Sequence, residues 1–342
     1  MDCFSQFRNT ISKPTKVEGY SVFDHGGILK KGLDNQVYVN SKIFNVRNID
    51  IQLNKDIDLY NHNLEESKVL LRSKILMDLY KSGGNNLKKK LNGTDFFLSR
   101  ETMCNIGNVY GCSKTTSWAF VLDDVIIIVK EYNKDKDIYK NIELNYFDHY
   151  FVNVITSKDG LGKLSYNKRV SNLDHYYEVS TTNISMPKKG TFKVGHYCKV
   201  DAFDKETNLP VKIETQNISQ SSSKCLTLPK LASVFFKCLI GDIQTVVVGC
   251  KKDRNICEVK KYLLKNIMHC ELRGDVIHCW QNIYKKFEEI KELFHKHGNR
   301  GCIRIQRDMG KNILSLDYFD EIQPEVRKLF TNEFCKIFFL KC

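Results

Sequence analysis

Acidic and basic residues alternate along the central stretch "HYCKVDAFDKETNLPVKIETQ", residues 196–216. The stretch predicts two short strands joined by a polar turn, with Asp201 on the first strand and Glu214 on the second. Residues two apart on a strand project from the same face, so Lys199 accompanies Asp201 and Lys212 accompanies Glu214. Carboxylates on adjacent strands are ligands that Mg²⁺ and similar hard cations require. The stretch therefore suggests a metal-dependent nuclease site in which lysines stand where further acid is expected.

The overall charge favours a polyanionic partner. The 342 residues include 53 Lys and Arg against 40 Asp and Glu, a formal charge of +13. Nucleic acid is the commonest partner of such a surplus, although a generally basic surface without a specific ligand has the same composition. The length suffices for one large domain or two modest ones.

The cysteines and the apolar segments bear on location. The chain has 13 cysteines, no Cys-x-x-Cys pair and an N-terminus without the apolar core of a signal peptide. This pattern predicts a reducing compartment, nuclear or cytoplasmic, and argues against secretion and against structural zinc. The most apolar run, residues 125–129, is too short to span a bilayer, so we expect no membrane association.

Hydrophobic periodicity predicts interleaved helices and strands without a regular βαβα order. We expect hairpins at 118–132, around Asp123-Asp124, and at 302–319, and loops with at most short strands over 153–195. The predicted helices are 63–84, 137–155, 228–241 and 275–298. The predicted class is therefore α+β, a mixed α/β domain built around two sheets.

Several stretches, taken in chain order, resemble the motifs of the DXO family of RNA decapping exoribonucleases. "FFLSRETM" resembles the family's arginine motif and places Arg100 at its phosphate-contacting position. "LNYFDHYF" is similar to the second motif, with Asp148 in place of Glu. "CKVDAFD" is similar to Glu-apolar-Asp, with Lys199 in place of the glutamate and Asp201 retained.

Two further motifs complete the resemblance, which covers roughly residues 20–335. "PVKIETQ" is similar to Val-Glu-Leu-Lys-Thr with the charges exchanged at Lys212 and Glu214. "KLASVFFKCLIGDIQTVVVGCK" resembles the helix and strand that follow, with Lys237 at the glutamine position. The resemblance implies a DXO-like single domain over 20–342, preceded by an N-terminal tail at 1–19, with two mixed β-sheets flanked by helices.

The family's reaction, as the resemblance implies it, uses two Mg²⁺ or Mn²⁺ ions to hydrolyse linkages at RNA 5′ ends. The matched positions here hold three carboxylates and four cations: Asp148, Asp201, Glu214, Lys199, Lys212, Lys237 and Arg100. Their formal charges sum to +1, which offers divalent cations little compensation for lost water. We therefore expect no cofactor, unless an active site retains Mg²⁺ or Mn²⁺ on Asp148, Asp201 and Glu214.

A salt-bridge ladder that joins Lys199 to Asp201 and Lys212 to Glu214 is the simplest arrangement of these charges. The preferred hypothesis is a DXO-like protein that binds RNA 5′ ends or nucleotides with little or no hydrolysis. The phosphate contacts would come from Arg100, Lys199, Lys212 and Lys237.

Two alternatives remain open. One is an active Mg²⁺- or Mn²⁺-dependent hydrolase acting on NAD-type or incomplete caps. The other is a scaffold for a protein partner such as a 5′-to-3′ exonuclease, a role implied by analogy with the family. His149, His196 and His278 are scattered along the chain, and the sequence favours a structural role for each.

Overall fold

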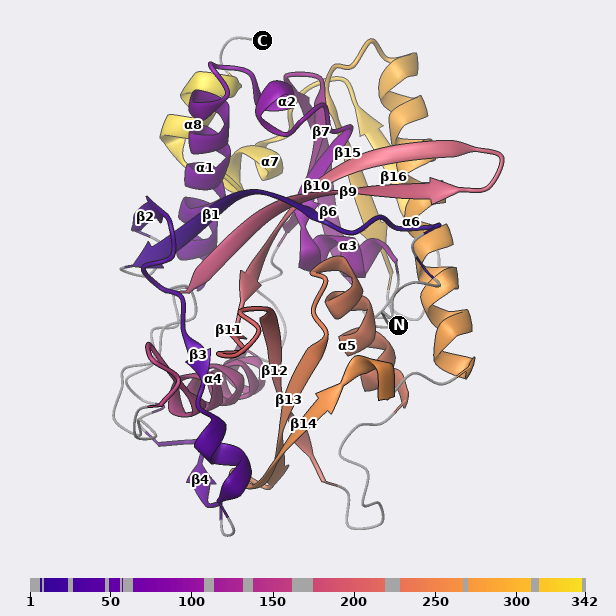
Figure 1. The fold of residues 1–342 in the computed structure, drawn as a ribbon. Helices are drawn as coiled ribbons and strands as arrows, with labels where there is room; N and C mark the ends of the chain where they lie inside the picture. Colours follow the sequence, from indigo (N-terminus) through magenta and orange to yellow (C-terminus); the bar gives the residue numbers. More distant parts are fainter. Residues whose placement is uncertain are drawn as a thin grey trace.

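The computed structural model places two mixed β-sheets one above the other, with helices around them (Figure 1). The residues that it describes are 7, 9–23, 27–46, 49–55, 57, 64–107, 114–131, 138–161, 175–218, 228–266, 270–308 and 314–339. The predicted class, two mixed sheets flanked by helices, is confirmed.

The upper sheet has nine strands within the described residues, in the order β16-β15-β6-β7-β5-β10-β9-β1-β2. It is mixed because β5 runs parallel to both β10 and β7, whereas the other pairs are antiparallel. Its strands are β1 (Thr15–Phe23), β2 (Ile28–Lys31), β5 (Phe96–Ser99), β6 (Thr115–Leu122), β7 (Val125–Glu131), β9 (Tyr176–Met186), β10 (Gly190–Val200), β15 (Cys302–Arg307) and β16 (Ser315–Phe319).

The lower sheet has seven strands within the described residues, in the order β4-β14-β13-β12-β11-β3-β8. Its β12 lies parallel to β13 and antiparallel to β11. Its strands are β3 (Tyr38–Val39), β4 (Ile51–Gln52), β8 (Thr156–Ser157), β11 (Ala202–Phe203), β12 (Pro210–Asn217), β13 (Thr245–Lys252) and β14 (Asn255–Leu263).

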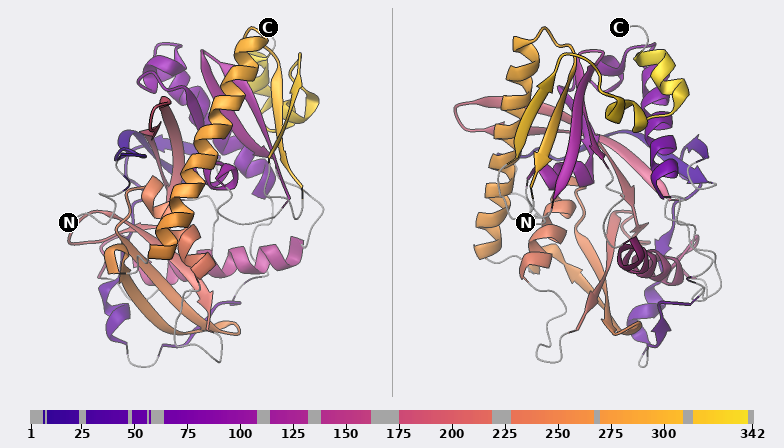
Figure 2. Two further views of the ribbon diagram at one scale, coloured as in Figure 1. Left: turned by 90° about the vertical axis from the view of Figure 1, so that its right-hand side faces the viewer. Right: turned by 180° about the vertical axis from the view of Figure 1, so that it is seen from behind.

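Helices cover both faces of each sheet. The helices are α1 (Leu64–Ser82), α2 (Leu87–Lys90), α3 (Arg100–Ile106), α4 (Ile138–Ile155), α5 (Leu228–Ile240), α6 (Cys270–Lys296), α7 (Pro324–Lys328) and α8 (Asn332–Phe338), with 3₁₀ turns η3 (Ser41–Asn45) and η5 (Leu264–Asn266). Figure 2 shows α6 running along the side of the molecule from the upper sheet down to the level of the lower one. No helix within these described ranges is long and apolar enough to cross a membrane.

Successive residues of the central strands enter two different cores, as the twofold strand period requires. On β5, Phe96 and Leu98 pack with α3, α5 and α6, whereas Phe97 packs with α1 and α8. Burial on both faces explains the unbroken apolar run Val125–Val129 on β7. The β6–β7 turn is formed by Asp123 and Asp124, whose φ angles of 52° and 57° match the type I′ hairpin turn.

Most of the predicted elements are present. The helix predicted at 275–298 buries the five apolar residues that its spacing places on one face: Trp280, Ile283, Phe287, Ile290 and Phe294. The hairpin predicted at 302–319 is β15–β16, and its tip, Met309-Gly310-Lys311, lies outside the described residues. The prediction of loops with at most short strands over 153–195 is wrong. The second half of this range holds all of β9 and the first part of β10, which are paired strands of 11 residues each.

The predicted tail at 1–19 is also corrected. Its boundary falls inside β1, which pairs with β9, and Phe7 and Ile11 are buried in the core. The described residues before position 20 therefore belong to the fold. That 20–342 forms one domain stays a prediction.

Candidate functional site

The two sheets are joined at Asp201. Strand β10 belongs to the upper sheet and ends at Val200, whereas β11 belongs to the lower sheet and begins at Ala202. Pairing of Ala202 with Val211 then brings β12 alongside, so that Lys212 and Glu214 lie close to Asp201. The prediction placed Asp201 on the first of two short strands; it lies instead at the crossing point between a long strand and a very short one.

Five of the predicted site residues form a continuous chain of ion pairs, here called the lysine–carboxylate cluster: Lys199, Asp201, Lys212, Glu214 and Lys237. Asp201 lies between two ammonium groups, with Lys199 Nζ 3.4 Å from Oδ1 and Lys212 Nζ 2.5 Å from Oδ2. Lys212 Nζ also lies 3.5 Å from Glu214 Oε1. Lys237 Nζ, from α5, lies 3.3 Å from the same oxygen. The predicted salt-bridge ladder is confirmed and extends to a third lysine.

Burial makes the pairing around Asp201 strong. The residue is only 3% exposed, and its Oδ2 also accepts a hydrogen bond from the backbone N–H of Ile213 at 3.0 Å. Burial by itself would raise the pKa of Asp201, but Lys212 and Lys199 together with this N–H hold it far below its usual range. The pKa of Lys212 is raised, because Asp201 and Glu214 outweigh the burial that would lower it. Both groups are therefore charged at neutral pH.

Lys199 has a second neighbour that the sequence did not suggest. Its Nζ lies 3.2 Å from His149 Nδ1, and the His149 ring stacks on His175 with centroids 5.5 Å apart. Burial, followed by Lys199 and His175, lowers the pKa of His149 well below its ordinary value. The pKa of Lys199 is lowered as well, by burial and by Lys212, against the opposing effect of Asp201.

Asp148 and Arg100 border the cluster. Asp148, on α4, accepts hydrogen bonds at Oδ1 from the N–H and the Oγ1 of Thr215, at 3.2 and 2.5 Å. Arg100 donates from Nη2 to the backbone carbonyl of Lys199 at 3.1 Å. Its Nη1 is buried and has no hydrogen-bond partner within the described part of the chain. The structure thus gathers all seven predicted positions in one region.

The other side chains that the sequence offered for this region are placed differently. Aromatic residues in or beside the matched motifs are candidate stacking surfaces for RNA bases. Tyr146 and Phe147 are buried at 1% and 3% exposure, whereas Tyr197 is partly exposed and stacks on Phe97. His196 is fully buried and His278 is exposed on α6. His149 alone among the three histidines noted touches the cluster.

The donors present do not fit a pair of divalent cations. Mg²⁺ and Mn²⁺ require several oxygen ligands, yet the oxygens of Asp201 and Glu214 already receive lysine ammonium groups. An ammonium about 4 Å from a cation repels it by several kcal/mol at an effective dielectric constant near 20. Within the ranges that the structure describes, no three His, Cys, Asp or Glu residues are grouped closely enough to hold a metal.

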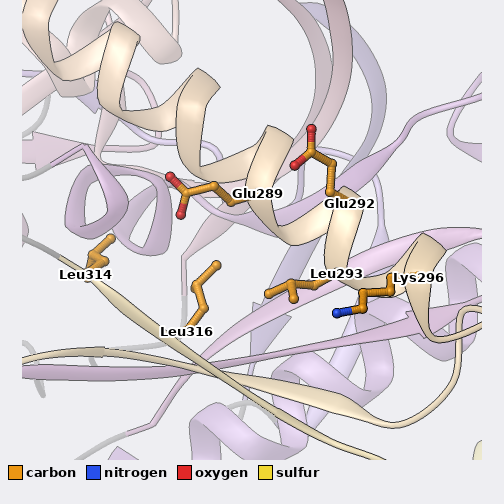
Figure 3. A pocket seen from close by; sticks show the side chains of 6 residues that line it. All are labelled: Glu289, Glu292, Leu293, Lys296, Leu314 and Leu316. Carbon is orange, nitrogen blue, oxygen red and sulfur yellow. The ribbon is translucent and has the colours of Figure 1, made fainter.

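A surface pocket of about 420 Å³ lies away from these residues (Figure 3). It is formed by α6 and the β15–β16 hairpin and is lined by Glu289, Glu292, Leu293, Lys296, Leu314 and Leu316. None of the cluster residues lines it. Its charged lining, Glu289, Glu292 and Lys296, comes from one helix, α6.

Comparison with known proteins gives different results for the sequence and for the structure. The sequence matches no protein-family model and no curated protein. The structure matches Candida albicans Rai1, solved with pU5 and Mn²⁺, with a TM-score of 0.70 and 16% identity over 96% of both chains. The chain has the Rai1 fold. This likeness extends to Scheffersomyces stipitis Rai1 with (3′-NADP)⁺ and calcium, at a TM-score of 0.66 and 15% identity over 96% of this chain and 97% of that one.

The Rai1 fold is shared with K. lactis Dxo1, solved in complex with manganese, at a TM-score of 0.61 and 13% identity over 92% of both chains. The fold that the motif resemblance implied, that of the DXO proteins, is therefore confirmed. At these identities the likeness concerns the fold. The roles of the cluster residues rest on the geometry described above.

Proposed function

We propose that this chain is a divergent DXO-family protein with a degenerate metal site, which binds RNA 5′ ends or nucleotides with little or no hydrolysis. The observation that carries the proposal is the position of the three lysine ammonium groups, within 2.5–3.5 Å of the carboxylate oxygens of Asp201 and Glu214. The Rai1 structures solved with pU5 or with (3′-NADP)⁺ support a phosphorylated ligand for this fold. We also place the protein in the nucleus or cytosol, because seven of its described cysteines are free thiols.

The lysines differ in how well they could reach a phosphate. The side chains of Lys199 and Lys237 are 22% and 20% exposed, whereas that of Lys212 is 11% exposed and lies between two carboxylates. Glu214 raises the pKa of Lys237 against the lowering effect of burial, so Lys237 carries its charge throughout the neutral range. Lys237, Lys199 and Arg100 are therefore the proposed phosphate contacts, and Lys212 holds the two carboxylates in place.

The first test measures binding of 5′-phosphorylated single-stranded RNA by fluorescence anisotropy, with EDTA present and absent. We expect binding that weakens steeply with salt, is unchanged by EDTA and is much weaker for the same RNA with a 5′-hydroxyl. Lys237→Gln should lower the affinity about tenfold, because a charge-assisted contact is lost. Lys261→Gln, which removes an exposed lysine paired with Asp204, is the matched control and should have little effect.

Turnover and binding assays separate the remaining alternatives. With Mn²⁺ or Mg²⁺, we expect little release of product from NAD-capped or 5′-triphosphorylated RNA. Brisk cap removal that disappears in Asp201→Ala would establish an active hydrolase with an altered ligand set and refute the degenerate site. If no phosphorylated RNA or nucleotide binds at all, the binding proposal fails, and a scaffold for a protein partner such as a 5′-to-3′ exonuclease becomes the better hypothesis.

A further inference from the structure

Three neighbouring parallel strands end at the same edge of the upper sheet, next to the lysine–carboxylate cluster. Tyr197 of β10 pairs with Ser99 at the end of β5, and Leu98 of β5 pairs with Ile128 of β7. The residues that follow along each strand are Lys199 on β10, Arg100 and Glu101 after β5, and Lys130 on β7. Ligands of mixed and parallel sheets commonly bind at the carboxyl ends of the strands. This edge therefore carries a row of charged side chains that begins at the cluster and continues beyond it.

Glu101 is the acidic residue in this row, and cations surround it. Lys130 Nζ lies 2.7 Å from Glu101 Oε1, and the Glu101 side chain is 46% exposed. Partial burial would raise the pKa of Glu101, but Lys130, Lys68 and Lys237 lower it to about 2. Lys130 of β7 therefore pairs directly with Glu101, and the charges of Lys68 on α1 and Lys237 on α5 add to its effect on the pKa.

Lys237 connects Glu101 with the lysine–carboxylate cluster. Its Nζ contacts Glu214 at 3.3 Å inside the cluster, and its charge also acts on Glu101 outside it. Figure 1 shows α3, which begins at Arg100, lying beside α5, which carries Lys237, and the two helices are in contact. The buried Nη1 of Arg100, which lacks a partner among the described residues, belongs to the same turn of chain as Glu101. The contact between α3 and α5 therefore places the cluster beside the strand edge.

We propose that Lys130 and Lys237 form a second phosphate subsite around Glu101, which holds a phosphodiester downstream of the RNA 5′ phosphate. In the unliganded protein the Glu101 carboxylate takes the place of that phosphate and competes with it. The inference rests on the proposed function, because it assigns the path of the RNA that leaves the cluster. It predicts that replacement of Glu101 and replacement of its partner Lys130 change RNA affinity in opposite directions.

The test compares the binding of uridine 5′-monophosphate and 5′-phosphorylated pentauridylate to the full chain. We expect the pentanucleotide to bind more tightly than the mononucleotide. Lys130→Gln should weaken pentanucleotide binding about two- to fivefold, which is the usual range for an exposed charge pair. It should also lower the slope of log affinity against log salt concentration by about 0.7, the value for one phosphate contact on a single strand. Glu101→Gln should tighten pentanucleotide binding by a similar factor.

The Lys189–Glu288 pair is the matched control, because its atoms lie 2.6 Å apart and its side chains are also partly exposed. Lys189→Gln and Glu288→Gln should leave both affinities unchanged, and thermal unfolding of each variant shows whether it is folded. If Glu101→Gln weakens binding as Lys130→Gln does, the pair is a structural ion pair and the subsite is refuted. If the pentanucleotide binds no more tightly than the mononucleotide, the subsite fails while the proposed function stands. If neither ligand binds, the proposed function itself fails.

Discussion

Asp201 is the residue on which the charges of the site depend. A carboxylate at 3% exposure has lost nearly all its water, and the protein replaces that water with two ammonium groups and one backbone N–H. Such a group is stable only while its partners remain, because a buried charge without compensation costs several kcal/mol. The nearest partner, Lys212, is shared with Glu214, so one lysine compensates two acids.

Replacement of Lys212 by Met should therefore lower the free energy of unfolding by about 3–5 kcal/mol. The double variant Asp201→Asn, Lys212→Met should recover part of this loss, because it leaves no unpaired charge at Asp201. Urea unfolding at neutral pH measures both. Lys261→Met is the control, because Lys261 pairs with Asp204 at 2.9 Å on the surface, and it should cost less than about 1 kcal/mol. Equal losses for the two lysine variants would contradict the role assigned to burial.

The pH dependence of this pair has a defined sign. Burial would raise the folded-state pKa of Asp201, but Lys212 and Lys199 lower it. Its contribution to stability is therefore complete above the unfolded-state pKa of about 3.9 and is lost as the pH falls through the lowered folded-state value. The stability difference between wild type and Lys212→Met should accordingly be largest at neutral pH and should shrink below about pH 4.

At the scale of elements, the position of α4 relative to β13 decides where Asp148 and His149 lie. The two elements meet at Gly249, where an added Cβ would lie 2.7 Å from the ring of Phe151 and 2.9 Å from Ile256. No real contact is this short, so the helix lies against the sheet at a distance that only glycine permits. Because α4 also carries Asp148, this close approach sets the border of the site.

Gly249→Ala should destabilise the protein by about 1–3 kcal/mol, because the core around Phe151 must shift to admit a methyl group. Binding of 5′-phosphorylated RNA should weaken with it, since α4 would move away from β12. Gly274→Ala is the matched control: Gly274 lies on α6 with nothing within 4 Å of an added Cβ. The control should raise the unfolding midpoint, because alanine is favoured over glycine in a helix by about 0.5–1 kcal/mol. A neutral Gly249→Ala would show that the contact is not tight.

At the scale of the whole molecule, the N-terminal residues help to hold the hairpin of β9 and β10 against the helices. Ile11 is fully buried and forms an isolated β-bridge with Ile184 of β9. Phe7 is equally buried and packs against Phe235 of α5 with ring centroids 5.7 Å apart. A segment that the sequence presented as a tail thus joins the longest hairpin to a helix that bears a site residue, Lys237.

Ile11→Ala should lower the free energy of unfolding by about 2–5 kcal/mol, the usual cost of truncating a buried isoleucine. Thermal or urea unfolding measures the change. Ile28→Ala, at a position that is 45% exposed on β2, serves as the control and should stay within about 0.5 kcal/mol of wild type. An Ile11→Ala protein as stable as wild type would mean that residues before β1 contribute little to the fold.

The local pattern of apolar and polar residues correctly predicted those elements in which the apolar residues are buried and the polar residues are exposed. The long helix α6 buries Trp280, Phe287 and Phe294 on one face, as its spacing predicts. The same pattern did not predict the strand β9, where Ser180, Thr181 and Thr182 are all buried at 4% exposure or less. Polar residues inside a central strand resemble a loop in sequence, because their hydrogen bonds come from distant strands that the local pattern does not contain.

For the site, the signs of the charges and their spacing two residues apart on shared strand faces could be read from the sequence. Which ammonium group pairs with which carboxylate could not, because those contacts depend on strand pairing and on helix docking. Lys237 reaches Glu214 from α5, and Arg100 reaches the carbonyl of Lys199 across 99 residues of chain, where parallel β5 and β10 end side by side. Spacing along one strand is fixed by covalent geometry, whereas distances between strands and helices are fixed by the packing of the whole core.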